Sequence, residues 1–255
     1  MNIIDRFRLD GKKALVTGSG RGLGRGFATA LAEAGADVAV IDILPENAER
    51  TAAEIAAATG RKTIAITADI SKADDVKRMI DQVVAAFGRL DIAVNNAGIS
   101  IPIKGISDIT PEDWEKQMSV NLNGTWNCIR EEGRVMIPNG YGKIINIGSI
   151  CGHVIWPHPQ PQLPYSVSKA AVIHMTRAAA AEYIRHGIRV NSISPGVTKV
   201  DDLFPEVVEM FFKTAPIDRT GIPADHQGAV IFLASSVSDF MVGQDIVIDG
   251  GYSIM

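Results

Sequence analysis

A tyrosine and a lysine lie four residues apart in the segment YSVSK, which covers positions 165–169. If this segment is helical, Tyr165 and Lys169 share one face of the helix. A tyrosine acts as a base near neutrality only when its pKa falls from its usual value of about 10, and a neighbouring ammonium group favours the charged form. The pair is therefore typical of a proton-transfer site, but it is equally typical of the start of an ordinary amphipathic helix.

Ser149 follows the apolar run Ile144–Ile147, which has the pattern of a buried strand. Ligands of parallel sheets bind beyond the carboxyl ends of the strands, so a serine at that edge can hydrogen-bond a substrate oxygen. A serine that simply ends a strand in a turn is the more common case. Its occurrence together with Tyr165 and Lys169 favours the catalytic interpretation.

A glycine-rich loop, TGSGRGLG at positions 17–24, separates a strand-like run from a helix-like stretch. Glycine lets the backbone approach a pyrophosphate closely, and the N-terminus of the next helix offers free N–H groups. Tight turns are often glycine-rich for structural reasons alone, but the position between strand and helix favours a dinucleotide site. The predicted cofactor contacts in this loop are Gly18, Arg21, Gly22, Leu23 and Gly24.

Asp42 ends the second strand-like run, VAVIDI. It lies about 20 residues beyond the loop, where a ribose-binding acid is expected. A carboxylate here can accept both ribose hydroxyls of NAD, and it would repel the 2′-phosphate of NADP. Arg21 argues the other way, because a basic residue in the loop could contact that phosphate, although a solvated arginine is an equally good interpretation. The sequence therefore predicts NAD as the cofactor.

Short apolar runs alternate with longer helix-like stretches along the whole chain. Continuously apolar strands in such an alternation are typical of a parallel sheet covered by helices on both faces. We expect an α/β fold with one Rossmann-type doubly wound domain over residues 1–255. The seven predicted strands are Ala14–Thr17, Val38–Ile41, Thr63–Thr67, Ile92–Val94, Ile144–Ile147, Val190–Ile193 and Ile246–Ile248. The clearest helices are Leu23–Ala34, Pro45–Thr59, Ser71–Phe87 and Ser166–Arg185.

The composition argues against several classes of protein. The chain has 255 residues and a formal net charge of −4, unlike a basic nucleic-acid-binding surface. No apolar run reaches the roughly 18 residues of a membrane span, and the charged N-terminus is not that of a signal peptide. The two cysteines, Cys128 and Cys151, do not make a disulfide framework. We expect a cytoplasmic protein that binds neither nucleic acid nor membranes.

The order of these motifs resembles the short-chain dehydrogenase/reductase family over essentially the whole chain. The matching segments are TGSGRGLG, NNAG (95–98), the strand ending in Ser149, YSVSK, SPG (194–196) and the ending IVIDGG (246–251). The resemblance implies that Tyr165 transfers the proton and that Ser149 holds the substrate oxygen. It also implies that Lys169 binds the nicotinamide ribose and tunes the tyrosine, while Asn121 of VNLNG supports a water relay.

The same resemblance implies further cofactor contacts. Many relatives carry a threonine four residues after the glycine of SPG, whereas this chain has Val200 there and Thr198 nearby. Thr198 is therefore taken as the corresponding contact. The other implied contacts are Asp69 and Ile70 at the adenine, Asn96, Ala97 and Gly98 beside the adenine ribose, and Pro195, Gly196 and Val197 around the nicotinamide.

The stretch between Ser149 and Tyr165, ICGHVIWPHPQPQLP, resembles the polyol and ketose dehydrogenase branch of the family. Glutamine amides both donate and accept hydrogen bonds, which suits a polyhydroxylated substrate. Solvated glutamines in a proline-rich surface loop are the alternative. No metal site is predicted, because the histidines lack a third ligand at a suitable spacing. The predicted substrate contacts are Ser149, His153, Trp156, Gln160, Gln162 and Tyr165.

Residues 198–219 are expected to form a lid over the substrate, as the equivalent segment does in the family. Phe204, Met210 and Phe211 are candidates for excluding water, and helix packing or a subunit contact would explain them equally well. The family resemblance also implies a homotetramer.

The leading hypothesis is an NAD-dependent oxidoreductase that interconverts a secondary alcohol and a ketone, with a sugar alcohol and its ketose as the preferred pair. The alternative is a 3-oxoacyl or hydroxysteroid-type ketone reductase. A non-catalytic dinucleotide-binding protein is the least favoured reading, because Tyr165 and Lys169 are both present.

Overall fold

The apolar runs form one seven-stranded sheet in the computed structural model, which describes residues 2–155, 162–200 and 205–255. The spatial order is β3-β2-β1-β4-β5-β6-β7, and every neighbouring pair is parallel. The predicted fold class is therefore confirmed. The strands are β1 (Lys13–Thr17), β2 (Asp37–Asp42), β3 (Thr63–Thr67), β4 (Ile92–Asn95), β5 (Gly142–Ile147), β6 (Ile188–Pro195) and β7 (Asp245–Ile248).

The strand order reverses beside β1. The chain runs outward from β1 through β2 to β3, and it then returns to place β4 on the other side of β1. The segments that leave β1 and β4 lead toward helices on opposite faces of the sheet, and such a switch point creates a crevice for ligands at the carboxyl edge. These two segments are the glycine-rich loop and the NNAG motif.

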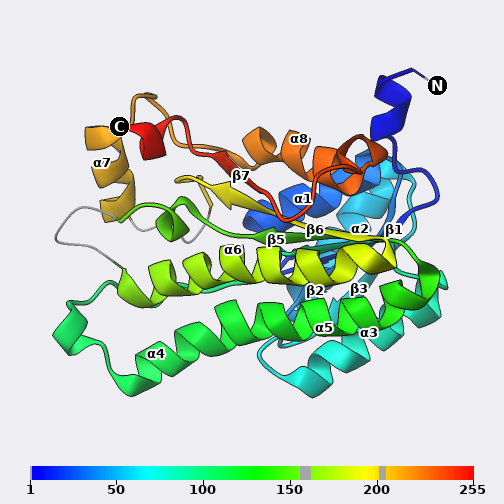
Figure 1. The fold of residues 1–255 in the computed structure, drawn as a ribbon, viewed down its shortest axis with the longest axis horizontal. Helices are drawn as coiled ribbons and strands as arrows, with labels where there is room; N and C mark the ends of the chain where they lie inside the picture. The colour runs from blue at the N-terminus through cyan, green and yellow to red at the C-terminus, as the bar shows by residue number, and fades with distance from the viewer. Residues whose placement is uncertain (1, 156–161, 201–204) are drawn as a thin grey trace.

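Helices cover both faces of the sheet (Figure 1). One face packs against α1 (Gly22–Glu33), α2 (Pro45–Thr59) and α8 (Pro223–Ala234). The other packs against α3 (Ala73–Phe87), α5 (Thr125–Met136) and α6 (Leu163–Tyr183). Two shorter helices, α4 (Pro111–Met118) and α7 (Pro205–Thr214), complete the set of α-helices within the described residues.

The two layers explain why the strands are apolar at every position. Successive side chains of a strand point to opposite faces, so Leu15 lies in one core and the next residue, Val16, lies in the other. Both side chains are completely buried. A strand with one wet face would need polar residues at alternate positions, and this sheet has helices on both faces instead.

The helix that carries Tyr165 and Lys169 begins earlier than predicted. The pattern indicated a start near Ser166, whereas α6 begins at Leu163 and holds Pro164 in its first turn. Proline is tolerated there, because the N–H that it lacks would have no partner inside the helix. Tyr165 is consequently held within the first turn of a 21-residue helix.

The sequence pattern did not predict the helices that lie between β4 and β5. This segment begins with α4, which Thr110 and Asp113 cap reciprocally. A π-helical turn, Ser119–Gly124, then leads into α5. No helix in the described part of the chain is both long and apolar enough to cross a membrane.

Candidate active site

A cavity of about 460 Å³ opens at the carboxyl edge of the sheet, between the ends of β5 and β6 and the start of α6. Many residues predicted for the site line it, namely Arg21, Leu23, Asn96, Gly98, Ser149, Gln162, Tyr165, Lys169, Pro195, Gly196, Val197 and Thr198. The other described candidates lie outside its lining, namely Gly18, Gly22, Gly24, Asp42, Asp69, Ile70, Ala97, Asn121 and His153.

Ser149, Tyr165 and Lys169 converge on this cavity. Ser149 follows the end of β5, and its side chain hydrogen-bonds to Tyr165. The Nζ atom of Lys169 lies 5.7 Å from the centre of the Tyr165 ring and donates to the Ile147 carbonyl at 2.8 Å. The strand end and the first turns of α6 therefore place an alcohol, a phenol and an ammonium group together.

Burial controls the protonation of the tyrosine and the lysine. It raises the pKa of Tyr165 above its usual value, and the hydrogen bond with Ser149 opposes this shift. Burial also lowers the pKa of Lys169 to about 8, since the ammonium group loses hydration. At neutral pH the pair is therefore a neutral phenol beside a charged lysine, so additional positive charge is needed before Tyr165 can work as a base.

Asn121 is fixed inside the π-helical turn. Its Nδ2 atom donates to the Ile99 carbonyl at 2.9 Å and to the Ser168 hydroxyl at 3.3 Å, while its Oδ1 atom accepts the Ile99 N–H at 2.8 Å. A Cβ atom added at Gly98 would lie 3.3 Å from Asn121 Oδ1 and 3.7 Å from Lys169 Nζ. Asn121 and Lys169 therefore approach the same glycine, as a relay between them would require. π-turns recur at functional sites.

The glycine-rich loop is pressed against the end of β4. Gly18 has φ +61°, and a Cβ atom there would lie 2.8 Å from the Ala97 Cα. A Cβ atom at Gly24 would lie 2.2 Å from the Gly18 carbonyl oxygen. Asn96 closes the contact by donating to the Thr17 and Gly18 carbonyls at 2.9 and 3.0 Å. Only glycine fits these two positions, so the backbone of the loop packs closely against the end of β4.

Asp42 lies at the end of β2 beside this loop. Its carboxylate accepts the Gly20 N–H at 2.9 Å and the Leu44 N–H at 3.1 Å. A Cβ atom at Gly20 would lie 2.5 Å from the Asn47 Cβ, which explains the glycine. The loop and the acid are thus held together at the carboxyl edge of the sheet.

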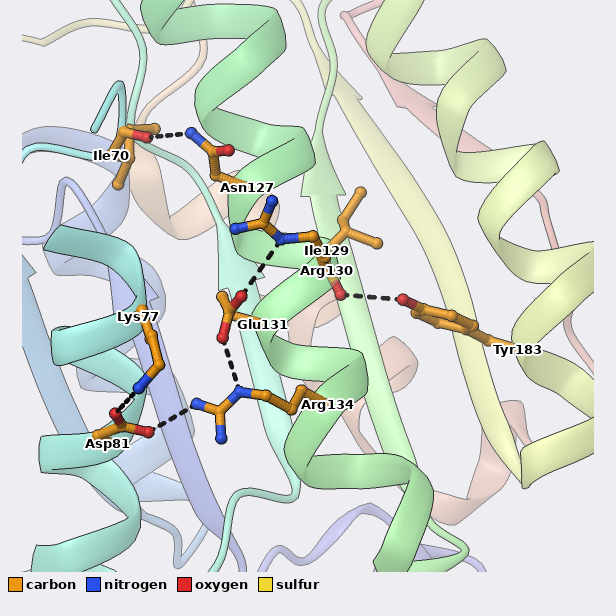
Figure 2. A network of polar contacts seen from close by, with 9 residues as sticks. All are labelled: Ile70, Lys77, Asp81, Asn127, Ile129, Arg130, Glu131, Arg134 and Tyr183. Carbon is orange, nitrogen blue, oxygen red and sulfur yellow. Dashed lines mark hydrogen bonds and ion pairs between the residues drawn. The ribbon is translucent and has the colours of Figure 1, made fainter. Parts of the chain in front are cut away.

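Asp69 and Ile70 are held by different partners. The Asp69 carboxylate accepts the Ser71 N–H at 3.0 Å and the Ser71 hydroxyl at 2.6 Å. The Ile70 carbonyl accepts Asn127 Nδ2 at 3.1 Å, as Figure 2 shows. This bond ties the loop after β3 to α5.

Further along α5, a chain of ion pairs joins the helix to α3 (Figure 2). Asp81 pairs with Lys77 and Arg134, and Glu131 pairs with Arg134 and Arg130, at 2.6 to 3.2 Å. Each such pair contributes at most about 1 kcal/mol near a surface. These ion pairs align α3 with α5. The Ile70–Asn127 hydrogen bond lies nearer to the carboxyl edge of the sheet.

The predicted substrate residues differ in their placement. Gln162 lines the cavity and has φ +43°, the only positive φ of a non-glycine residue among those described. His153 instead bonds to Asp245 at 2.7 Å and does not line the cavity. Trp156 and Gln160 lie outside the described residues, as does Phe204 of the predicted lid.

The cavity also includes residues that the sequence pattern did not assign to it. Cys151 lies two positions after Ser149, and its N–H donates to the Ser149 hydroxyl at 3.2 Å. The position of Cys151 shortly after the end of a strand could have identified it as a residue of the site. Val207 on α7 also lines the cavity, and no local pattern indicated this, because the position of α7 depends on tertiary packing. No cluster of metal-binding side chains occurs within the described parts of the chain.

Comparisons with known proteins agree with this geometry. A family model described as "Enoyl-(Acyl carrier protein) reductase" matches residues 18–253. "Galactitol 2-dehydrogenase" from Rhizobium johnstonii is 40% identical over 261 residues, covering 99% of both chains. "Probable NADP-dependent mannitol dehydrogenase" from Yarrowia lipolytica is 36% identical, covering 98% of this chain and 91% of the relative.

A solved structure is similarly close. The gluconate 5-dehydrogenase from Burkholderia cenocepacia J2315, in complex with NADP and tartrate, has 37% identity and a TM-score of 0.92 over all of both chains. The chain therefore belongs to the short-chain dehydrogenase/reductase family, which confirms the resemblance seen in the sequence. It is an oxidoreductase that acts on alcohols with a nicotinamide dinucleotide.

Proposed function

We propose that this enzyme uses NAD to interconvert a secondary alcohol and a ketone, and that its substrate is a sugar alcohol or the corresponding ketose. The observation that carries the proposal is the convergence of Ser149, Tyr165 and Lys169 on one cavity at the sheet edge. The polyol relatives support the choice of substrate.

Each catalytic residue has a separate task in this proposal. Ser149 donates a hydrogen bond to the substrate oxygen and holds it next to the Tyr165 hydroxyl. Tyr165 gives a proton to that oxygen during reduction and removes one during oxidation. Lys169 supplies positive charge, which favours the tyrosinate that oxidation requires. Bound nicotinamide supplies or accepts the hydride and, when oxidised, adds a further positive charge.

The residues around the glycine-rich loop fit a dinucleotide. Gly18 and Gly24 let the loop pack closely where side chains would clash, and α1 begins at Gly22, so that the N–H groups of its first turn can bind a pyrophosphate. Arg21, Leu23 and Asn96 line the cavity that leads from this loop to Tyr165.

The preference for NAD rests on Asp42. A relative is named as NADP-dependent, so the family alone does not decide between the two cofactors. A carboxylate held beside Gly20 would repel a 2′-phosphate, and two like charges about 4 Å apart cost about 4 kcal/mol near a protein surface. Arg21 is the opposing group, and we give it the smaller weight because its place in the loop also suits a pyrophosphate.

The experiment is a substrate panel with the purified protein. We expect NAD-dependent oxidation of one or more of galactitol, mannitol, xylitol and sorbitol, with a lower kcat/KM for NADP. Tyr165→Phe removes the proton-transfer group and should abolish turnover without weakening NAD binding. Turnover of 3-oxoacyl or steroid ketones without any polyol activity would overturn the substrate proposal and favour the alternative reductase.

We further propose a homotetramer and a reducing compartment. Trp114 on α4 and Trp126 on α5 are 39% and 51% exposed, which suits a subunit contact on that side of the molecule. Cys128 and Cys151 are both buried and are not joined in a disulfide. Sedimentation analysis should give a mass near four chains, and a monomer would contradict the first proposal.

A further inference from the structure

His226 is a buried histidine that the proposed reaction does not use. It lies in the first turns of α8 and is 1% exposed. Its Nε2 atom is 2.8 Å from the Thr198 hydroxyl oxygen, and that hydroxyl is also 3.1 Å from the Gly196 carbonyl oxygen. Its Nδ1 atom is buried without a hydrogen-bond partner in the described structure. Thr198 and Gly196 both line the catalytic cavity.

The backbone around Thr198 is held independently of this histidine. The Gly221 N–H donates to the Val197 carbonyl, and the Lys199 N–H donates to the Gly221 carbonyl, both at 2.8 Å. Thr198 and Gly221 thereby form an isolated parallel bridge. These backbone bonds fix the position of the cavity wall, and the contact of His226 with Thr198 is to its hydroxyl.

Two arrangements of hydrogens are possible. In the first, Nε2–H donates to the Thr198 oxygen, and Thr198 donates to the Gly196 carbonyl. In the second, Thr198 donates to Nε2, the Gly196 contact loses its hydrogen, and Nδ1 carries an N–H that is buried without a partner. Orphaned buried N–H groups are rarer than unused acceptors, so the first arrangement is the more stable.

We propose that His226 is a positioning residue for the nicotinamide side of the cavity, where its Nε2–H locks the Thr198 hydroxyl so that Thr198 presents only a hydrogen-bond acceptor. The acceptor fits the carboxamide NH₂ group of the cofactor. The contact with the cofactor rests on the proposed function. The assignment of the hydrogens on His226 does not depend on it.

The surroundings of His226 keep it neutral. Burial lowers the pKa of His226, and the neighbouring Asp225 carboxylate opposes that shift. Asp225 is itself paired with Arg219 through two contacts of 2.7 and 2.9 Å and accepts the Ile222 N–H at 2.8 Å. Its charge is therefore largely compensated, and one ring nitrogen of His226 carries a single hydrogen at neutral pH.

Nitrogen NMR of isotope-labelled protein without cofactor tests the first part directly, since the shifts of the two ring nitrogens distinguish the tautomers. We expect His226 to be the Nε2–H tautomer. An Nδ1–H tautomer or a doubly protonated ring at neutral pH would overturn the proposal, whatever the substrate proves to be.

Cofactor binding tests the second part. His226→Leu should weaken NAD binding roughly fivefold, because one hydrogen bond contributes about 1 kcal/mol. The same substitution should not weaken the binding of 3-acetylpyridine adenine dinucleotide, because the acetyl group of this analogue lacks the NH₂ donor. His226→Gln keeps an N–H donor and should restore most of the NAD affinity. Equal weakening for both dinucleotides would mean that His226 acts only through the general structure of the wall.

Two further variants complete the test. His186→Leu removes an exposed histidine after α6 and should leave both affinities unchanged. In a double-mutant cycle, His226→Leu should cost nothing further once Thr198→Val has removed the hydroxyl. Additive losses would contradict the coupling. If the unaltered protein bound neither NAD nor NADP, the proposed function would fail, and the NMR result would still decide the tautomer.

Discussion

At the scale of single residues, the chemistry depends on how a few side chains are held. Ser149 follows the end of β5, and Lys169 lies one turn after Tyr165 in α6. Both therefore approach Tyr165 from rigid elements, which fixes the positions of the three side chains relative to one another. Asp42 and Gln162 are constrained differently, the first by backbone N–H groups and the second by an unfavourable backbone conformation. Each constraint leads to a measurable expectation.

Asp42→Ala should raise the KM for NAD about tenfold and reduce the discrimination against NADP. The substitution removes the carboxylate that we propose binds the ribose, and hydrogen bonds to charged groups contribute about 1.5 to 3 kcal/mol. Steady-state kinetics with both dinucleotides provide the measurement. An unchanged preference would show that another group, with Arg21 the first candidate, selects the cofactor.

Gln162 provides a matched pair of substitutions. Gln162→Ala removes the amide but keeps a side chain at φ +43°, whereas Gln162→Gly also relieves the conformation. We expect both to raise the KM for a polyol severalfold without changing NAD affinity. The glycine variant should be the more stable of the two by about 1 kcal/mol in urea unfolding. If neither alters the polyol KM, Gln162 is only a spacer before α6.

At the scale of elements, the position of α7 decides how the cavity is closed. The helix places Val207 in the cavity lining, and Phe211, one turn further along the same helix, is buried and stacks on Tyr252 with ring centres 5.7 Å apart. Tyr252 is held near the C-terminus by the Asp249 carboxylate, which accepts the N–H groups of Gly251 and Ser253. The last residues of the chain therefore anchor the predicted lid.

Tyr252→Ala should loosen α7 and raise the substrate KM more than it changes the affinity for NAD. Loss of a buried aromatic ring costs about 3 kcal/mol, and here the loss falls on the packing of one helix. Tyr252→Phe keeps the ring and should behave like the unaltered enzyme. Equal impairment in both variants would show that the hydroxyl, and not the stacked ring, holds the helix.

At the scale of the whole molecule, one acidic group lies in the core between the sheet and α5. Glu132 is completely buried and accepts Asn95 Nδ2 at 3.1 Å. Glu132 Oε1 and Asn95 Oδ1 are both buried without partners among the described residues. Burial raises the pKa of Glu132 to about 8, so the carboxyl is protonated at neutral pH. A protonated carboxyl that donates to Asn95 Oδ1 would satisfy both oxygens.

This group should make the fold less stable as the pH rises from about 4 to about 8. The unfolded chain ionises Glu132 near its ordinary pKa of about 4.3, whereas the folded chain keeps the proton until about pH 8. Between these values the unfolded state loses the proton first, so stability falls as pH rises, by up to about 1.4 kcal/mol per pH unit, and the loss is complete above pH 8.

Glu132→Gln removes this dependence. We expect its Tm to exceed that of the unaltered protein at pH 8 and the difference to shrink toward pH 5. Glu131→Gln is the matched control, because Glu131 pairs with two partly exposed arginines, Arg130 and Arg134, and its replacement should lower stability slightly at all these pH values. Parallel pH profiles for the two variants would contradict the assignment.

The amino-acid sequence by itself determined the sheet and the glycine-rich loop, and it was enough to propose Ser149, Tyr165 and Lys169 as the catalytic trio. Seven apolar runs with helical stretches between them specify a parallel sheet, since only strands covered on both faces are apolar throughout. Gly18 and Gly24 were recognisable because strand, turn and helix follow one another directly, and Tyr165 and Lys169 because they are one helical turn apart.

The tertiary structure alone decided the contacts between distant elements. His226 reaches Thr198 from 28 positions away, and Glu132 reaches Asn95 from 37 positions away. The side chain of His153, next to the catalytic segment in sequence, instead meets Asp245. Local patterns reflect backbone preferences and periodicity over a few residues. Which side chains meet in a core depends on how whole helices and strands pack, and no short stretch of sequence encodes that.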